Sequence, residues 1–515
     1  MTNDSPYSIT HLRNSIWYFL TGKVVSAVMT FFILLWVVRL LTLEEYGVYI
    51  TLVAGMELVI AISGLGLPWL AARYLPEYRL HASGSLIQRL AWGLLLWMTI
   101  FLSIFVGLLE IAMFYNLFSW TNFNASREVT VLYLIVLLVE GIRRFIIIGL
   151  LEPLMQQHIV RASLVVRQFM FISILFLFTT EGTAQLIDVV RVELFASFFG
   201  MVVSFIGLWR YLSKLTGSPG KADWREHDLV EMCRTGFKMY IAQLFTLLYS
   251  PQIFQILLIS SIGSGAAAVF GFLRTLYDQV ARYLPATLFI GLIRPKLITS
   301  FIDGGGMVAL FRNVNLAGKL SFFVLMPLVA LSAQTGELMV ELLSGGRFSE
   351  SGLLFFGFML VLIPFSQRQL IESIAVTSGH AGLCVWAAAS GLILLPLMWI
   401  MLQMELGLWA GITVMGLGHF LFNIIVVKGV SKLIAYRSDW LGFVKLLISA
   451  LVAYGVGLLL SLISAVNGNF SWLLIVFQCG SVMAAYFTFA WWIKPFSKDE
   501  RERINTLIKY PVFVW

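Results

Sequence analysis

The sequence has little charge, and it has few polar stretches long enough to form a soluble domain. Only 12% of its 515 residues are Asp, Glu, Lys or Arg, whereas 59% are hydrophobic. The mean hydropathy is +0.89. A soluble protein of this length cannot bury so large a share of apolar side chains in domains of ordinary size. The composition therefore excludes an ordinary soluble protein and indicates that lipid surrounds most of the chain.

Cysteine is also scarce. The chain has three cysteines, Cys233, Cys384 and Cys479, which lie far apart and form no CxxC pair. This spacing excludes a disulfide framework and a zinc site built on paired cysteines. We interpret the three residues as small apolar side chains that fill space between helices, and we expect neither a metal nor a cofactor.

The usual motifs of catalysis are missing as well. The sequence contains no GxxxxGK[ST] phosphate loop, no HExxH motif and no recognisable pair of nucleophile and base. We therefore expect no enzymatic activity, and in particular neither ATP hydrolysis nor glycosyl transfer. Work done by this chain would draw on ion gradients or on the membrane potential.

Long apolar segments are abundant. A membrane-spanning helix needs about 20 mostly apolar residues. Hydropathy predicts spans at residues 15–37, 48–70, 90–113, 129–151, 162–180, 187–209, 239–261, 268–291, 320–343, 353–371, 381–403, 408–427, 442–465 and 471–493. The predicted fold class is an all-α polytopic membrane protein with about fourteen transmembrane helices.

Lys and Arg are distributed unevenly between the two sides of these spans. With the N-terminus inside, nearly all basic loop residues fall on the cytoplasmic side, Lys319 and Arg368 among them, and the opposite loops contribute only Arg127 and Arg347. This asymmetry is what the positive-inside rule describes. We therefore interpret the net charge of +8 as a signal of topology rather than of nucleic-acid binding. An even number of spans places both termini in the cytoplasm of a multi-pass inner (plasma) membrane protein.

The order of the spans indicates an internal repeat. A polar stretch near Leu215–His227 separates six spans from the next six, and each half opens with a long helix followed by Tyr46-Gly47 or Phe270-Gly271. Both halves start on the same side, so the repeat is parallel and a transport path is expected between the halves. The predicted organisation is a six-helix bundle (1–214), a cytoplasmic linker (215–237), a second six-helix bundle (238–430), and two additional helices with a basic tail (431–515).

The N-terminal motifs carry a family resemblance. The segments Arg39-Leu40-Leu41, Glu44-Glu45-Tyr46-Gly47-Val48-Tyr49, Gly64-Leu65-Gly66 and Arg73-Tyr74-Leu75-Pro76-Glu77 resemble the signature of polysaccharide transporters of the O-antigen flippase type. Thr42-Leu43 departs from that pattern, since Gly-Pro is common there. The resemblance implies the fold of the multidrug/oligosaccharidyl-lipid/polysaccharide exporter superfamily: two six-helix bundles around a lumen, and an extra helix pair at the C-terminus. It supplies no catalytic residues.

Several charged residues fall within the predicted spans. Each costs about 2.5–3.5 kcal/mol at the centre of a helix in lipid, so they should face a wet lumen. They are Lys23, Arg39, Glu57, Glu140, Arg143, Arg144, Arg191, Arg274, Asp278 and Arg282. Most are basic, which suits an anionic head group. We predict Arg274, Asp278, Arg282, Arg39, Arg143, Arg144 and Tyr277 as substrate-binding residues, and Glu57 and Glu140 as residues that couple transport to proton movement.

Each of these residues has an alternative interpretation. Arg274, Asp278 and Arg282 recur at a spacing of four, which places them on one helix face beside Tyr277, where they could bind pyrophosphate or form a stripe of salt bridges between helices. Arg39 could pair with Glu44 or Glu45 as an anchor at the membrane surface. Arg143 and Arg144 could reach the interface. Glu57 and Glu140 could each pair with an arginine instead of carrying a proton.

We conclude from the sequence that the chain is a flippase. It would move a polyprenyl-diphosphate-linked oligosaccharide from the inner to the outer leaflet by alternating access, for the biosynthesis of cell-surface polysaccharide. Its partners would be this substrate, membrane lipids, and polysaccharide polymerase or export proteins, and no nucleic acid. The main alternative is a cation-coupled multidrug antiporter of the same superfamily, for which an acidic lumen is expected. A membrane-embedded glycosyltransferase or polymerase and a non-transporting scaffold are further alternatives.

Overall fold

The computed structural model is helical throughout the residues that it describes. These are residues 9–115, 126–179, 185–215, 226–287, 306–377, 380–434, 439–467 and 472–508, with 217, 220 and 224 in the linker. No strand occurs among them. Eleven helices in this part of the chain are long and apolar enough to cross a membrane, and a shorter apolar helix covers Val24–Leu40. The prediction of an all-α polytopic membrane protein is confirmed.

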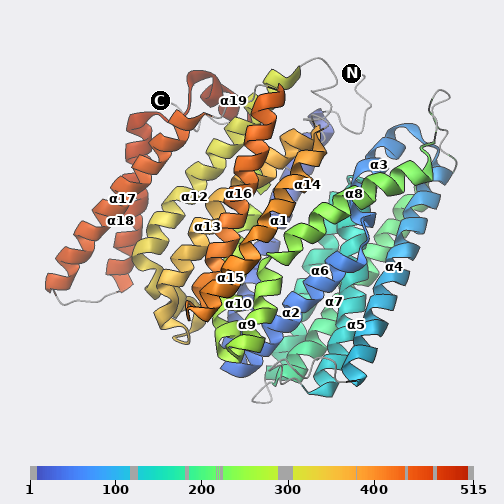
Figure 1. Ribbon diagram of the computed structural model, residues 1–515, viewed down its shortest axis with the longest axis horizontal. Coiled ribbons are helices and arrows are strands. Elements are labelled where there is room, and N and C mark those ends of the chain that lie inside the picture. The colour runs from blue at the N-terminus through green and yellow to red at the C-terminus, as the bar shows by residue number, and fades with distance from the viewer. Residues whose placement is uncertain are drawn as a thin grey trace. The chain divides into compact units, whose positions relative to one another are not determined.

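The chain divides into two compact units, Met1–Phe272 and Leu273–Trp515. This division does not test the predicted one at residues 215–237, which stays a prediction. Figure 1 shows that long helices run side by side within each unit. The first unit holds α1 (Ile9–Leu40), α2 (Leu43–Ser63), α3 (Leu67–His81), α4 (Gly84–Phe114), α5 (Arg127–Arg144), the π-helix η1 (Phe145–Leu151), α6 (Gln157–Thr179), α7 (Leu186–Leu215), α8 (Leu229–Leu248), α9 (Pro251–Ser261) and the start of α10 (Ser264–Tyr283).

The second unit begins within α10 and continues through long helices. Its helices are α12 (Gly306–Ser344), α13 (Gly352–Thr377), α14 (Ala381–Ser390), α15 (Leu394–Gln403), α16 (Leu408–Ile434), α17 (Trp440–Asn467), α18 (Trp472–Ile493) and α19 (Lys498–Ile508). Short 3-10 turns lie at Ser349–Ser351 and Gly391–Ile393. Helix α12 packs against α13 and α17, and α17 packs against α18.

Several of the predicted spans are interrupted, and two of these interruptions lie in the described part of the first unit. The expected span 48–70 ends early, because α2 stops at Ser63 and α3 starts at Leu67 after a tight turn. In that turn Leu65 has φ 43° and Gly66 has φ 86°. A Cβ on Gly66 would lie 2.5 Å from the carbonyl oxygen of Gly236 in α8. The glycine therefore allows both the left-handed backbone and the close approach of α8.

The other interruption lies in the expected span 239–261. This segment forms two helices, α8 and α9, with a break at Ser250 and Pro251. Proline lacks an N–H and is tolerated in the first turn of a helix but not in its interior. The sequence signal for this break is therefore Pro251 itself.

The start of α2 explains the departure from the family pattern at Thr42. Thr42 is the N-cap of α2: its hydroxyl accepts a hydrogen bond from the Glu45 N–H, and the Glu45 carboxylate accepts one from the Thr42 N–H. This reciprocal pair is a capping box. The other carboxylate oxygen of Glu45 accepts the N–H of Leu186 at the start of α7. Glu45 thus caps α2 and ties it to α7.

The two glycines of the predicted repeat, Gly47 and Gly271, lie where α2 meets the start of α10. A Cβ on Gly47 would lie 2.1 Å from the carbonyl oxygen of Ser264, and a Cβ on Gly271 would lie 2.4 Å from the Ile50 side chain. Both positions require glycine because the two helices approach each other so closely there. The Tyr46-Gly47 and Phe270-Gly271 motifs therefore allow close packing of α2 against α10 in this unit.

Candidate functional site

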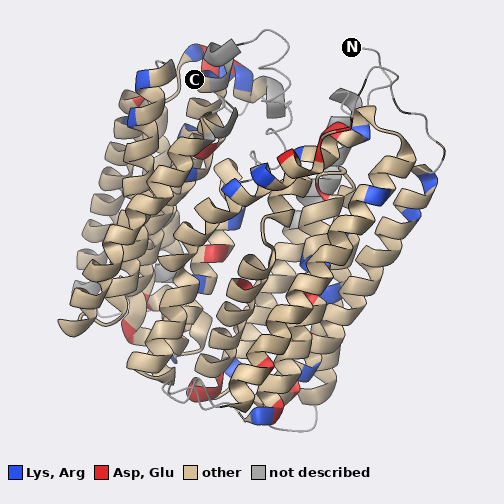
Figure 2. Ribbon diagram, turned by 45° about the vertical axis from the view of Figure 1, so that its right-hand side comes forward, with Lys and Arg blue, Asp and Glu red and all other residues tan. Residues whose placement is uncertain are grey.

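Charged residues occur along the length of helices in the first unit as well as at helix ends (Figure 2). At the centre of the internal group lies Glu140 of α5, whose side chain is 1% exposed. Its two carboxylate oxygens accept hydrogen bonds from Nε and Nη2 of Arg143 at 2.7 and 2.6 Å. Nε of Arg144 donates to the same carboxylate at 2.9 Å. Residues three and four apart share a helix face, which is why one carboxylate meets both arginines.

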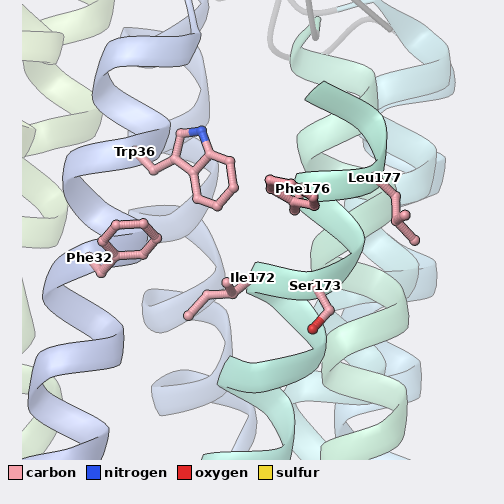
Figure 3. Close-up of a pocket in the computed structure, with 6 residues that line it drawn as sticks. All are labelled: Phe32, Trp36, Ile172, Ser173, Phe176 and Leu177. Atoms are coloured by element: carbon pink, nitrogen blue, oxygen red, sulfur yellow. The ribbon is translucent and has the colours of Figure 1, made fainter. Parts of the chain in front are cut away.

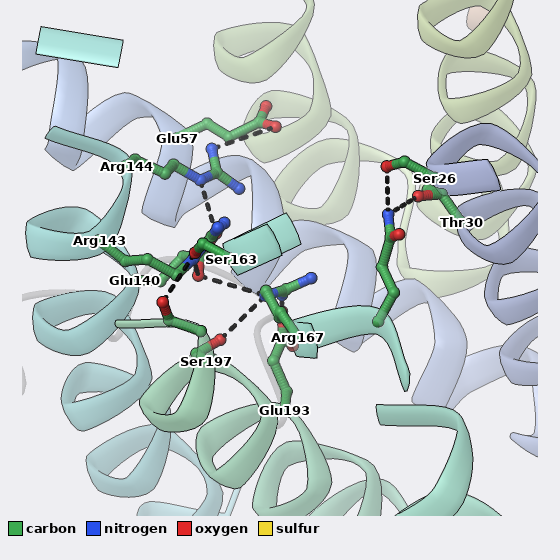
Figure 4. Close-up of polar contacts among 12 residues, drawn as sticks. Ser26, Thr30, Glu57, Glu140, Arg143, Arg144, Ser163, Arg167, Glu193 and Ser197 are labelled. Carbon is green, nitrogen blue, oxygen red and sulfur yellow. Dashed lines mark hydrogen bonds and ion pairs between the residues drawn. The ribbon is translucent and has the colours of Figure 1, made fainter. Parts of the chain in front are cut away.

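A third arginine reaches Glu140 from α6. Nε of Arg167 lies 3.3 Å from a carboxylate oxygen of Glu140, and its Nη2 lies 3.1 Å from that of Glu193 in α7. Nε of Arg167 also donates to the Ser197 hydroxyl at 3.2 Å. The Tyr49 hydroxyl of α2 donates to Glu193 at 3.1 Å. Four helices, α2, α5, α6 and α7, therefore meet at one polar group (Figure 4).

Glu57 of α2 lies at the margin of this group. Its carboxylate is 4.0 Å from Nη1 of Arg144 and accepts a hydrogen bond from the Gln252 amide at 3.1 Å. We call Glu57, Glu140, Arg143, Arg144, Arg167 and Glu193 the charged network. Its three arginines and three glutamates balance in formal charge.

The charged network has a closed interior and an accessible edge. The side chains of Arg143 and Glu193 are 5% and 4% exposed, whereas that of Arg144 is 31% exposed. Glu57 and Arg167 lie between, at 19% and 18%. Two of the three accessible residues are arginines. An incoming charged group would therefore meet two guanidinium groups and one carboxylate first.

Close packing of the helices holds the network together. A Cβ on Gly200 of α7 would lie 3.0 Å from side-chain carbons of both Arg143 and Arg167. The Ser163 hydroxyl of α6 donates to the Gly200 carbonyl at 2.7 Å. Directly after Arg144 the chain continues as the π-helix Phe145–Leu151. Single π-helical turns are rare and occur often at functional sites.

The sequence predicted part of this group. Glu57, Glu140, Arg143 and Arg144 were predicted as separate candidates, and the structure brings all four together. Both glutamates pair with arginines, as the alternative interpretation stated. Arg167 and Glu193 were missed, although each is a charged residue inside a predicted apolar span. That signal was present in the sequence and would have found them.

The predicted group on α10 is only partly assembled. Nε of Arg274 lies 3.6 Å from the Asp278 carboxylate, and the Arg274 side chain is 5% exposed. The Tyr277 ring is buried against Phe358 and Phe365. Arg282 is exposed. The spacing of four therefore pairs Arg274 with Asp278, while the two arginines differ in burial.

The remaining candidates lie at helix ends. Arg39 is exposed in the last turn of α1. Arg191 is exposed near the start of α7 and pairs with Glu128 at 3.2 Å and with Asp188 at 3.4 Å. The Lys23 side chain lies outside the described residues.

Two basic residues that the sequence placed in cytoplasmic loops are instead buried in helices of the second unit, so that interpretation was wrong. The Lys319 side chain is 1% exposed, and its ammonium lies 2.6 Å from Asp439 and 2.5 Å from Glu500 of α19. Arg368 lies 3.1 Å from Nδ1 of His419 and 4.0 Å above the Phe422 ring. Lys319 directly precedes the predicted span 320–343, and α12 begins earlier, at Gly306; Arg368 lies near the end of the predicted span 353–371, and α13 continues to Thr377.

Among the described side chains, no group of three or more His, Cys, Asp or Glu residues could hold a metal ion. Glu140 is poorly placed to bind a cation, because Arg143, Arg144 and Arg167 already hold its carboxylate. What the arrangement offers chemically is binding of an anionic group at its edge by planar guanidinium groups, which suit phosphate oxygens.

Comparisons with known proteins agree with this picture. The sequence profile of a family described as polysaccharide biosynthesis protein matches residues 11–288, more than half of the chain. No curated protein sequence matches the chain significantly. Among solved structures, the lipid II flippase MurJ in an inward closed conformation is 12% identical over 92% of this chain and 97% of its own, with a TM-score of 0.59.

Two multidrug transporters are similar in structure as well. An inward-facing MATE family transporter of the MOP superfamily is 16% identical over 80% of this chain and 96% of its own, with a TM-score of 0.55. The MATE transporter VcmN of Vibrio cholerae, in a mutant form, is 15% identical over 82% and 97%, with a TM-score of 0.53. At these identities the likeness shows a shared fold, and the fold expected from the N-terminal motifs is confirmed.

Proposed function

Because the chain belongs to the polysaccharide biosynthesis protein family, we propose that it is a flippase for a polyprenyl-diphosphate-linked oligosaccharide. It moves this lipid from the inner to the outer leaflet by alternating access, for the biosynthesis of cell-surface polysaccharide. The multi-pass architecture and the fold shared with a lipid II flippase support this function.

The observation that carries the proposal is the pairing of the Glu140 carboxylate with arginines in the charged network. Glu140 accepts hydrogen bonds or ion pairs from Arg143, Arg144 and Arg167, so it has little capacity left for a cationic ligand. The accessible edge presents Arg144 and Arg167. A diphosphate binds there without displacing the buried Glu140–Arg143 pair. The same arrangement is unfavourable for an organic cation.

The residues on α10 form a second set of proposed contacts to the head group. Arg274, Asp278, Arg282 and Tyr277 remain proposed substrate-binding residues, together with Arg39 and Arg144. For Arg143, which is buried against Glu140, we propose an indirect role in holding the carboxylate that positions Arg144 and Arg167. The Arg274–Asp278 pair at 3.6 Å is loose enough for a phosphate oxygen to compete for the guanidinium. Glu57 is the more accessible of the two proposed coupling residues, since Glu140 is buried beneath the arginines.

Transport of this kind breaks no covalent bond, so we propose no enzymatic activity. An inside-negative potential drives an anion outward with about 2.3 kcal/mol per charge per 100 mV. The proposed location is the inner (plasma) membrane with both termini in the cytoplasm. Membrane lipids surround the chain, and polysaccharide polymerase or export proteins receive its product.

The alternative function is a cation-coupled multidrug antiporter. The observation that favours it is the fold shared with MATE transporters. It predicts extrusion of organic cations, and it predicts that Glu57 or Glu140 must be free of arginine during transport. A direct comparison of drug resistance in cells with and without the protein separates the two functions.

The proposal is tested in cells depleted of the protein, by measuring how much lipid-linked oligosaccharide reaches the outer leaflet. Wild type should restore its appearance, and the double variant Arg274→Ala with Arg282→Ala should not, at equal membrane levels. If depletion leaves the outer-leaflet lipid unchanged, the flippase function is wrong and drug extrusion becomes the leading function.

A further inference from the structure

Glu193 of α7 is the carboxylate of the charged network that depends on a single arginine. Among the described residues, the only basic side chain that forms an ion pair with it is Arg167, whose Nη2 lies 3.1 Å away. The Tyr49 hydroxyl also donates to it, at 3.1 Å. Glu193 is 4% exposed. In contrast, Glu140 is held by three arginines, and Glu57 is 19% exposed. Glu193 is therefore the carboxylate that is left buried without a cation if Arg167 binds another anion.

The guanidinium of Arg167 is only partly engaged by its neighbours. Nε contacts Glu140 and Ser197, and Nη2 contacts Glu193. No described residue accepts a hydrogen bond from Nη1, and the side chain is 18% exposed. Arginine binds phosphate best through two parallel N–H···O bonds. A phosphate at the edge formed by Nη1 and Nη2 therefore competes with Glu193 for Nη2 and leaves Nε with Glu140.

The apolar groove of the same unit offers no competing site for a phosphate. This groove, of about 680 Å³, lies between α1 and α6 and is shown in Figure 3. It is lined by Phe32, Trp36, Ile172, Ser173, Phe176 and Leu177. None of these side chains is charged, so an anionic head group is expected at the accessible edge of the charged network instead.

Binding of a diphosphate at that edge changes the charge balance around Glu193. The titratable and charged side chains that face Glu193 are Arg167 from α6, Tyr49 from α2, and Tyr133, Glu140 and Arg144 from α5. The two arginines of this set are the ones that the diphosphate engages, and the tyrosines carry no positive charge. A buried carboxylate whose charge is no longer compensated becomes neutral rather than remain ionised. Glu193 is the residue in that position.

We infer that Glu193 takes up a proton when a diphosphate head group binds to Arg144 and Arg167, and releases it when the head group leaves. The proton comes from water at the accessible edge and adds to a carboxylate oxygen of Glu193, and no other covalent bond forms or breaks. This inference rests on the proposed function and assigns a coupling residue beyond Glu57 and Glu140. It requires that the affinity for the head group rises as the pH falls.

The test is isothermal titration calorimetry with the purified full chain in detergent. The probe is farnesyl diphosphate, a soluble polyprenyl diphosphate. Titrations in buffers that differ in ionisation enthalpy give the number of protons taken up for each molecule bound. Proton exchange by the probe itself is common to all variants, so the difference between variants reports on the protein. At about pH 7, wild type should take up more protons than Glu193→Gln, by up to one for each molecule bound.

The affinities distinguish this role from a purely structural one. Glutamine imitates the protonated carboxyl, so Glu193→Gln should bind the probe about tenfold more tightly than wild type at about pH 8, which corresponds to one pH unit of protonation. This difference should shrink toward about pH 6. A residue that only ties α6 to α7 has the opposite effect, because its replacement loosens Arg167 and weakens binding.

Two further variants complete the comparison. Tyr49→Phe removes a hydrogen bond that favours the ionised form of Glu193. It should shift affinity and proton uptake in the same direction as Glu193→Gln, by a smaller amount, and it keeps the test valid if Glu193→Gln does not fold. Glu128→Gln removes an equal charge at a position that is 72% exposed, and it should match wild type.

Either of two results would overturn the inference: proton uptake by Glu193→Gln equal to that of wild type, or weaker binding by this variant at every pH. Flipping is then measured in vesicles that contain the same proteins. Flipping without a difference in proton uptake removes the role of Glu193 and leaves the proposed function standing. Proton uptake that depends on Glu193, without flipping, supports the inference and removes the function.

Discussion

Glu140 of α5 and Arg167 of α6 lie 27 residues apart in the sequence, yet a carboxylate oxygen and Nε of this pair approach to 3.3 Å inside a membrane-spanning bundle. Burying charges in lipid is costly, and a buried pair recovers that cost only with good geometry and further hydrogen bonds. Here Arg143, Arg144 and Ser197 supply them. The contact therefore joins α5 to α6 at one carboxylate, and Arg167 extends the contact to α7 through Ser197 and Glu193.

Removing the charge of Glu140 should destabilise the fold. Glu140→Gln leaves Arg143, Arg144 and Arg167 without their shared counter-charge, and breaking a buried ion pair costs about 3–5 kcal/mol. We expect a clear fall in the melting temperature of the purified protein in detergent. Glu128→Gln is the matched control, because Glu128 is 72% exposed where it pairs with Arg191. A Glu140→Gln protein as stable as wild type would show that the network does not support the fold.

Gly66 should tolerate no side chain. Gly66→Ala forces a Cβ into a left-handed backbone, which costs about 1–2 kcal/mol, and also into contact with the Gly236 carbonyl. Gly93→Ala in the interior of α4 meets nothing within 4 Å and should stabilise the protein by about 0.5–1 kcal/mol. Melting temperatures of the two variants should move in opposite directions from wild type. Movement in the same direction would argue against the turn at Leu65–Gly66.

The pair formed by Asp439 and Lys319 should give a pH-dependent contribution to stability. Partial burial opposes ionisation of the Asp439 carboxyl, but the hydrogen bond and charge of Lys319 outweigh it and lower the pKa of Asp439 below its ordinary value. A lowered pKa in the folded state adds stability above the pKa of the unfolded chain, about 3.9, and this stability is lost as the pH falls through the folded-state pKa.

The measurement is the difference in melting temperature between wild type and Asp439→Asn at several pH values. The variant should be less stable at pH 7, by a difference that stays constant down to about pH 5 and shrinks below about pH 4. Asp499→Asn changes an exposed residue of α19 and should have little effect at any of these pH values. A difference that grows toward low pH would contradict the assignment.

The sequence predicts the helices of this protein well, because a helix that crosses lipid needs a run of about 20 mostly apolar residues. Each predicted span overlaps a described helix, or two helices broken at a residue such as Pro251. The errors concern basic residues near the ends of predicted spans: Lys319 directly precedes the span 320–343, and Arg368 lies near the end of the span 353–371. Their burial depends on partners such as Asp439 and His419, which are distant in the sequence.

The candidate site is less predictable, because most of its contacts join residues that are distant in the sequence. Spacing within one helix predicts that Glu140 meets Arg143 and Arg144, and that Arg274 meets Asp278. No spacing rule relates Arg167 of α6 to Glu193 of α7, because that contact depends on how the two helices pack at Gly200. Charge within an apolar span indicates that a residue matters, and the fold decides which residue it meets.

The most direct test of the central claim is flipping of a fluorescent polyprenyl-diphosphate oligosaccharide in vesicles that contain the purified protein. Arg144 is the accessible arginine of the charged network, so Arg144→Ala should slow flipping about tenfold, as the loss of about 1.4 kcal/mol of binding to the head group would do. Arg191→Ala removes an exposed arginine outside the network and should flip at the wild-type rate. Equal rates for wild type and both variants would contradict the role of the charged network in transport.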